Sequence, residues 1–158
     1  MPVDFRLKSL PYHEFKNLFT LTDSALKKMG ATRMLVDKFP GFPCRVSLQD
    51  AEPGEEVILL PYQHHKTNSP YQASGPIFVR KVAATAVLNT NEIPVMFNHR
   101  LLSLRGYDKN GIMKAAEVIE GNTLKEKLHQ LFDNENIAYI HIHNARPGCY
   151  NCLVERVE

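Results

Sequence analysis

The sequence lacks the features of an exported or membrane-spanning protein. No apolar run approaches the roughly 18 residues that a membrane-spanning helix requires, and residues 1–8 do not contain the apolar core of a signal peptide. We therefore expect a cytoplasmic location and no membrane partner.

Cysteine is also scarce. The three cysteines, an odd number, argue against a disulfide framework and for reduced thiols.

Neither sign of charge is in clear excess. The 19 basic and 17 acidic residues leave a net charge of +2, and the basic residues are scattered along the chain. We therefore expect no nucleic-acid partner. The glycine-rich phosphate loops G-x-x-x-x-G-K-[ST] and G-x-G-x-x-G are both absent, which excludes nucleotide binding by those motifs. The sequence indicates neither a cofactor nor an oligomeric state.

The composition is that of an ordinary globular protein. The chain has 158 residues, of which 44% are hydrophobic and 23% charged. Folding at this length buries roughly two-thirds of the surface that the unfolded chain exposes. We expect residues 1–158 to form a single globular domain.

Two helices are predicted. The first covers residues 25–29, with a cap among residues 22–24 and Gly30 as its left-handed stop. The second begins at Asn122 or at Thr123, whose spacing to Glu126 is that of a capping box, and ends near residues 133–134. Its apolar face contains Leu124, Leu128 and Leu131.

Strand patterns dominate the rest of the chain. The clearest unit is a hairpin formed by residues 101–107 and 112–120, closed by an Asn-Gly turn. Residues 61–76 have no periodicity and many turn formers, which is typical of a long irregular loop that carries function. The remaining strands are predicted at residues 44–48, 57–60, 77–80, 137–143 and 149–157. Because no βαβ alternation occurs, we predict an α+β fold with one mostly antiparallel sheet and two covering helices.

The segment 141–152 has the residue types of a metal site. His141 and His143 stand two apart in a strand, so both imidazoles point to one face. Cys149 and Cys152 could complete a Cys2His2 zinc site. In a regular strand, however, Cys152 points to the opposite face, which leaves three ligands at most. Zinc binding is therefore an alternative interpretation, and no metal ligand is assigned.

The same segment offers a nucleophile. Cys149 follows the flexible Gly148, and His143 is a nearby candidate base. The competing interpretation is that Cys44, Cys149 and Cys152 are small buried residues and that the histidines are hydrogen-bonded strand residues.

Three arginines suit an anionic ligand. Arg45, Arg105 and Arg146 lie at predicted strand ends or turns, and guanidinium groups bind carboxylates and phosphates bidentately. Ser74 and its neighbour Gly75 could add backbone amides from the 61–76 loop. Alternatively, each arginine pairs with a surface carboxylate.

Together these patterns predict a pocket for a small polar or anionic molecule, formed by residues 141–149 and the 61–76 loop. Whether the protein is an enzyme is left open. The alternatives are a structural or protein-interaction module without catalysis and a zinc-binding protein. The catalytic candidates are His141, His143 and Cys149, and the ligand-binding candidates are Arg45, His64, Tyr71, Ser74, Arg105, Asn144 and Arg146.

Five strings along the chain carry a family resemblance. They are Pro-Gly-Phe-Pro-Cys-Arg-Val (40–46), Pro-Gly-Glu-Glu-Val-Ile-Leu-Leu-Pro-Tyr (53–62), Ser-Pro-Tyr-Gln-Ala-Ser-Gly-Pro-Ile-Phe-Val (69–79), Arg-Gly-Tyr-Asp (105–108) and His-Ile-His-Asn-Ala-Arg-Pro-Gly-Cys-Tyr (141–150). In this order they resemble an uncharacterised bacterial family that is defined as a domain of unknown function. The resemblance implies a single-domain bacterial cytosolic protein, and no activity, cofactor or catalytic residue comes with it.

Overall fold

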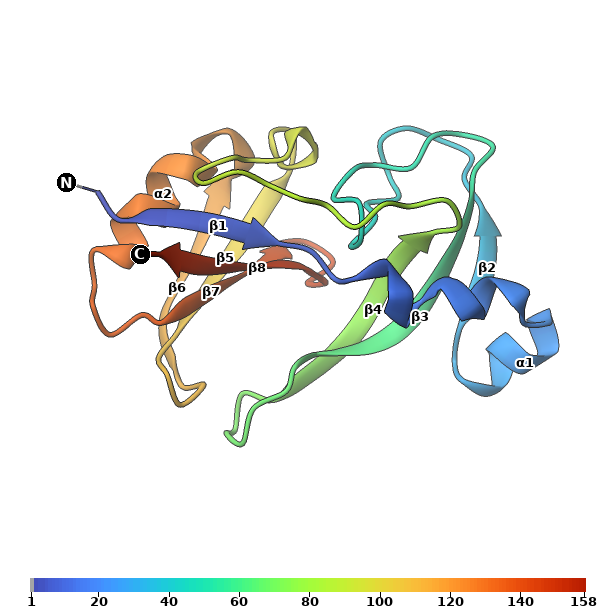
Figure 1. The fold of residues 1–158 in the computed structure, drawn as a ribbon, viewed down its shortest axis with the longest axis horizontal. Coiled ribbons are helices and arrows are strands. Elements are labelled where there is room, and N and C mark those ends of the chain that lie inside the picture. The colour runs from blue at the N-terminus through green and yellow to red at the C-terminus, as the bar shows by residue number, and fades with distance from the viewer. Residues whose placement is uncertain (1) are drawn as a thin grey trace.

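The computed structural model describes residues 2–158 and contains eight strands in two separate sheets (Figure 1). The larger sheet has five strands in the order β1-β8-β7-β5-β6, and every neighbouring pair is antiparallel. Its strands are β1 (Asp4–Lys8), β5 (Leu101–Tyr107), β6 (Met113–Glu120), β7 (Tyr139–Asn144) and β8 (Tyr150–Val157). The predicted α+β class with mostly antiparallel strands is confirmed.

The smaller sheet has three antiparallel strands in the order β2-β3-β4. These are β2 (Thr32–Leu35), β3 (Glu56–His65) and β4 (Ala73–Arg80). The α-helices are α1 (Asp23–Lys28) and α2 (Leu124–Phe132), and short 3-10 turns cover Tyr12–Glu14, Lys16–Thr20, Val95–Phe97 and Gly121–Thr123. Within residues 2–158, no helix combines the length and the apolar character needed to cross a membrane.

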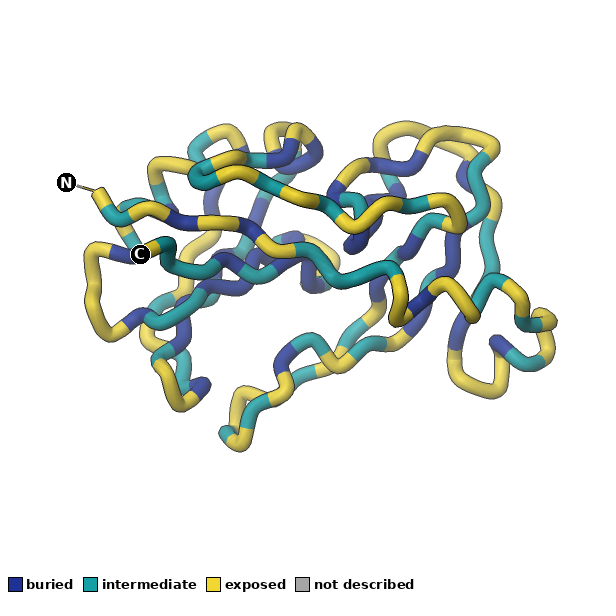
Figure 2. Tube along the Cα trace, viewed as in Figure 1, coloured by how far each residue is buried: buried dark blue, intermediate teal, exposed yellow. Residues whose placement is uncertain are grey.

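Each sheet has its own hydrophobic core. Helix α2 covers one face of the five-stranded sheet, where Leu124, Leu128 and Phe132 pack with the first core. Helix α1 contributes Leu26 to a second core on the three-stranded sheet. Short buried stretches, drawn in dark blue, occur in the strands of both sheets (Figure 2). Each sheet thus has one apolar face filled by its own helix and neighbouring segments, as expected for layered folds.

Strand β7 is buried on both faces. Ile140 and Ile142 point into the first core, and the alternation of a strand turns Tyr139, His141 and His143 to the opposite face. His141 and His143 are buried there although no helix covers that face. The rings of His64 and His65, at the end of β3, cover them instead. The two sheets therefore meet through a layer of aromatic rings.

The prediction of a single sheet is wrong. Strands β3 and β4 pair with each other and with β2, and none of the three pairs with the five-stranded sheet. Strand periodicity specifies which residues share a face, but it does not specify which strands are neighbours. The hairpin predicted over residues 101–120 is confirmed as β5 and β6.

Two predicted segment boundaries are also wrong. Residues 44–48 form a tight turn, in which the Leu48 amide donates to the Cys44 carbonyl, instead of a strand. The segment 61–76 is mostly strand, because β3 continues to His65 and β4 begins at Ala73. Only the hairpin connection between them remains a loop. It is anchored by the Ser69 hydroxyl, which donates to the Gly111 carbonyl at 2.9 Å.

The helix caps give one confirmation and one correction. Thr22 caps α1 by accepting a hydrogen bond from the Ala25 amide, and Gly30 follows at φ 76°. Helix α2 has no side-chain cap from Asn122 or Thr123. The Thr123 hydroxyl donates instead to the Glu120 carbonyl at 2.7 Å, because a 3-10 turn precedes the helix and leaves the capping-box geometry unformed.

Gly121 is required where this 3-10 turn passes under the start of β5. A Cβ at Gly121 would lie 1.7 Å from the Phe97 carbonyl oxygen and 2.8 Å from that of Arg100, so no side chain fits unless the backbone moves. We predict that Gly121→Ala lowers the free energy of unfolding by about 2 kcal/mol or more, measured by urea denaturation. Gly75→Ala is the matched control, since a Cβ there meets nothing within 4 Å. Equal losses in both variants would contradict this account of the turn.

Candidate functional site

The layer between the sheets is built from histidines and tyrosines. Strand β7 contributes His141 and His143, and the end of β3 contributes His64. The ring centroids of His64 and His143 are 5.0 Å apart, those of His64 and His141 6.1 Å, and those of His141 and His143 6.3 Å. Tyr150, at the start of β8, stacks on His64 with 5.0 Å between centroids. Three imidazoles from β3 and β7, which belong to different sheets, are thus neighbours in space.

His65 belongs to the same layer, and both of its nitrogens are hydrogen-bonded. Its Nδ1 lies 2.7 Å from the Tyr71 carbonyl oxygen, and its Nε2 lies 2.6 Å from the Tyr139 hydroxyl. Because a carbonyl only accepts, Nδ1 is the donor and Nε2 accepts from the tyrosine. Tyr139 also stacks on Tyr107 with 5.3 Å between centroids. His65 therefore fixes the end of β3 against the five-stranded sheet.

The other three imidazoles have nitrogens without a partner. Among residues 2–158 no hydrogen-bond partner is present for the buried Nδ1 atoms of His64 and His141 or for the buried Nε2 of His143. The Nδ1 of His143 lies 3.0 Å from the Gly148 carbonyl oxygen, so it carries the proton and Nε2 presents a lone pair. Buried polar atoms are normally paired, so each of these nitrogens calls for an explanation.

Burial keeps these imidazoles neutral. Desolvation is the main cause that lowers the pKa of His64 to about 4, that of His143 to about 3 and that of His141 to about 2. Arg105, which lies opposite His141 in the β5–β7 pairing, adds positive charge that also disfavours protonation. At neutral pH His64, His141 and His143 are therefore neutral imidazoles with free lone pairs.

A cavity of about 760 Å³ opens onto this layer. His64, His65 and His141 line it, together with Tyr62 and Tyr139. Charged side chains complete its wall, namely Lys66, Glu135, Glu155, Arg156 and Glu158. The cavity thus reaches His141, although this side chain is only 4% exposed.

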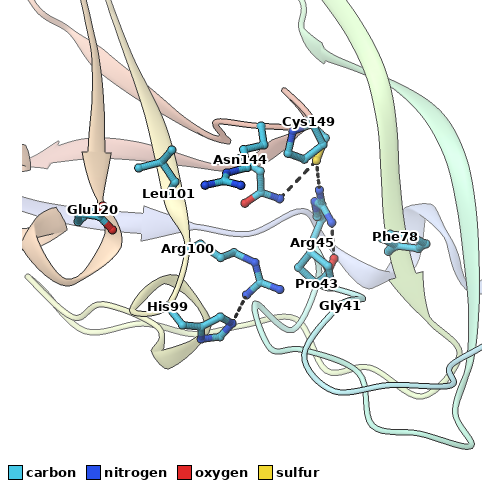
Figure 3. Close-up of a pocket in the computed structure, with 12 residues that line it drawn as sticks. Gly41, Pro43, Arg45, Phe78, His99, Arg100, Leu101, Glu120, Asn144 and Cys149 are labelled. Carbon is cyan, nitrogen blue, oxygen red and sulfur yellow. Dashed lines mark hydrogen bonds between the residues drawn. The ribbon is translucent and has the colours of Figure 1, made fainter.

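The turn between β7 and β8 holds Cys149 in a second environment (Figure 3). Gly148 has φ 82°, which allows its amide to donate to the Asn144 carbonyl at 2.9 Å. The Cys149 sulfur accepts from Arg45 Nη2 at 3.0 Å and from Asn144 Nδ2 at 3.3 Å. Asn151, fully buried, donates its Nδ2 to Asn144 Oδ1 at 2.9 Å and so fixes that amide. Two polar side chains thus donate to one sulfur, and a third fixes one of them.

Arg45 is the largest fully buried side chain of the protein, with 1% exposure. Its Nε donates to the Tyr150 carbonyl at 2.7 Å, and its Nη1 donates to the Pro43 carbonyl. Among the described residues no carboxylate forms an ion pair with it. Burial lowers the pKa of this guanidinium, whose nearest ionisable partner is the Cys149 thiol.

A cavity of about 580 Å³ lies beside this pair, between the two sheets. Arg45, Asn144, Arg146 and Cys149 line it on one side, and Pro43, Phe78, Leu101 and Pro147 give it an apolar wall. Arg100 also lines it, but its Nη1 is paired with Asp50 Oδ2 at 2.9 Å. Figure 3 shows Arg45 between Cys149 and Pro43, with Arg100 and His99 farther from the sulfur.

The other two cysteines line neither cavity. Cys152 is buried in the first core, on the face of the sheet opposite to His141 and His143, and burial raises its pKa. Cys44 is buried in the second core, where its sulfur accepts from the Arg80 amide at 3.4 Å. Throughout residues 2–158, no three His, Cys, Asp or Glu side chains are grouped so as to hold a metal ion. The Cys2His2 arrangement considered from the sequence is not formed.

The predicted site residues therefore separate into two groups. Arg45, Asn144, Arg146 and Cys149 share one cavity, and His64 and His141 line the other. His143 lies between them, since its ring belongs to the histidine layer and its Nδ1 supports the turn at Gly148.

Three predicted residues join neither cavity wall. Arg105 faces the histidine layer, Tyr71 is 38% exposed, and Ser74 lines a shallow surface hollow beside Gly30. Sequence reasoning also missed the contributions of Asn151 and Arg100. Asn151 could have been identified from the sequence, because it places an amide inside the apolar strand 149–157. No pattern in the residues around Arg100 identifies it as a site residue.

The neutral histidines predict a loss of stability in acid. In chelator-treated protein, the free energy of unfolding should fall as the pH is lowered from about 6.5 toward 4, because unfolded imidazoles bind protons near pH 6.5 and the buried ones do not. Each buried histidine adds a slope of up to about 1.4 kcal/mol per pH unit. Urea denaturation across this range should show a shallower slope for His141→Asn than for the wild type. His13→Asn, at an exposed position, should keep the wild-type slope. An unchanged slope in His141→Asn would contradict the prediction.

Comparisons with known proteins give a family and nothing closer. No curated protein and no solved structure matches the chain. Residues 41–156 match the family described as protein of unknown function (DUF1203). The matched region contains the whole cavity beside Cys149, most of the wall of the other cavity, and every candidate residue predicted from the sequence. The chain therefore belongs to the DUF1203 family of proteins of unknown function.

Proposed function

We propose that the cavity beside Cys149 binds a small anionic molecule and that Cys149 is the nucleophile that reacts with it. The observation that carries this proposal is the buried guanidinium of Arg45, which is 1% exposed and has no carboxylate partner among residues 2–158. A buried charge without a counter-charge is strongly unfavourable, and guanidinium groups stay protonated in proteins. A negative charge next to Arg45 is therefore required.

Two sources of that charge are compatible with the contacts. The first is Cys149 itself, since its sulfur accepts hydrogen bonds from Arg45 Nη2 and Asn144 Nδ2. The second is an anion in the adjoining cavity. A thiolate is the nucleophilic form of cysteine, so the first source makes Cys149 reactive and the second brings a substrate to it.

The cavity suits a small organic acid. Its volume of about 580 Å³ lies within the range of small-molecule sites. Arg146 is exposed at its wall and forms no ion pair with a described carboxylate, which leaves its guanidinium free for an anionic group. The apolar residues Phe78 and Leu101 would contact the rest of the molecule. Glu120 also lines the cavity and disfavours ligands of high negative charge.

Two alkylating reagents of similar size and different charge test both parts of the proposal. Iodoacetate is anionic and iodoacetamide is neutral. The rate of alkylation by iodoacetate is divided by that of iodoacetamide, both for Cys149 and for a free small thiol. The first of these ratios divided by the second is a normalised ratio that measures anion recognition at Cys149. We expect a normalised ratio of about five in favour of iodoacetate, as one partly screened charge interaction of about 1 kcal/mol provides. Mass spectrometry should place the label on Cys149, because Cys44 and Cys152 are fully buried.

Variants separate recognition from reactivity. Arg146→Gln should reduce the normalised ratio toward one, and Arg45→Gln should in addition slow both reagents. Arg6→Gln, at an exposed position on β1, is the matched control and should leave both rates unchanged. A normalised ratio of one in the wild type, or a ratio that Arg146→Gln and Arg45→Gln do not change, would rule out anion recognition at Cys149.

A further inference from the structure

We infer that His64 and His141 bind a late first-row transition-metal ion such as Cu²⁺ or Zn²⁺, with solvent from the adjoining cavity completing its coordination. The site lies on the histidine layer, apart from the cavity beside Cys149, and it does not depend on the reaction proposed there. Both side chains line the cavity of about 760 Å³. Both also present a buried Nδ1 without a hydrogen-bond partner in the described chain.

The unpaired nitrogens point to a missing ligand. His141 is 4% exposed, and its buried Nδ1 has no hydrogen-bond partner among the described residues. A neutral imidazole has one donor and one acceptor nitrogen, so burying it in this way is unfavourable unless something else contacts the ring. Buried polar atoms of this kind mark the position of a water or an ion.

The spacing of the rings fits a shared ion. Imidazole nitrogens bind zinc at about 2.0–2.1 Å, so the centroids of two ligand rings lie at most about 6.4 Å apart, the upper limit being reached when the two nitrogens are on opposite sides of the ion. The His64 and His141 centroids are 6.1 Å apart. His143 is the next nearest imidazole, 5.0 Å from His64 between centroids, and its Nδ1 proton is held by the Gly148 carbonyl. A backbone carbonyl that orients a histidine in this way is a common outer-shell feature of metal sites.

The chemistry of the layer selects the class of ion. Its free donors are neutral nitrogens, which suit zinc, copper and nickel, whereas magnesium and calcium require oxygen ligands. Arg105 lies opposite His141 and repels any cation that is held by charge alone. Glu135 and Glu155 on the cavity wall partly offset that charge. Coordination bonds to nitrogen are therefore the main attraction, as in sites for late transition metals.

His65 is not a ligand of this site. Its two nitrogens are already engaged by the Tyr71 carbonyl and the Tyr139 hydroxyl. The site thus has two protein ligands, and the described residues offer no group of three that could hold an ion. Open coordination positions then face the cavity and are available to water or to a small ligand.

Copper binding to protein purified without a histidine tag and treated with chelator tests the inference. Titration calorimetry with Cu²⁺ should give one equivalent, and the electron paramagnetic resonance spectrum should show splitting from two imidazole nitrogens. His64→Ala and His141→Asn should each weaken binding at least about tenfold, a loss that even outer-shell changes can cause. Because His64 is only partly buried, His64→Ala keeps the test decisive should His141→Asn fail to fold.

Two controls define the site. His13→Ala, at an exposed histidine, should bind Cu²⁺ like the wild type, and so should Cys149→Ser, which separates this site from the thiol. Absence of stoichiometric binding would overturn the inference. Binding that survives both His64→Ala and His141→Asn, or that is lost equally in His13→Ala, would overturn it as well.

Discussion

The burial of the Arg45 guanidinium is the constraint on which the arrangement of the two sheets depends. Its backbone amide donates to the Phe78 carbonyl of β4, and its side chain donates to the Tyr150 carbonyl at the start of β8. One residue therefore joins the smaller sheet to the larger one through groups that must be satisfied because they are buried. No carboxylate is among its described partners, and its Nη2 donates to the Cys149 sulfur at 3.0 Å.

The histidine layer is the second connection between the sheets. The isoleucines of β7 point into the first core, which α2 covers, and the histidines of the same strand point to the opposite face. The end of β3 covers these histidines. This packing has a cost, since imidazole nitrogens are buried without partners in the described chain. It also has a chemical consequence, since burial holds the rings neutral and leaves their lone pairs free.

Strand β7 and the turn that follows it relate the two cavities. His143 occupies both environments, with its ring in the histidine layer and its Nδ1 proton on the Gly148 carbonyl of the turn that carries Cys149. A ligand that moved this imidazole would also move the turn. The two proposed sites therefore have a physical connection, yet they differ in chemistry. One offers guanidinium groups and a sulfur to an anion, and the other offers neutral nitrogens to a metal ion.

The sequence by itself determined the local features of this protein. Two-residue periodicity placed His141 and His143 on one face, the Asn-Gly turn set the β5–β6 hairpin, and Thr22 and Gly30 bounded α1, because each depends on residues close in the chain. Only the tertiary structure decided that strands 56–65 and 73–80 form a separate sheet, that Arg45 reaches Cys149, and that His64 covers His141. The Arg45–Cys149 and His64–His141 contacts join residues separated by about half the chain or more, and periodicity and turn chemistry contain no information about such pairs or about which strands share a sheet.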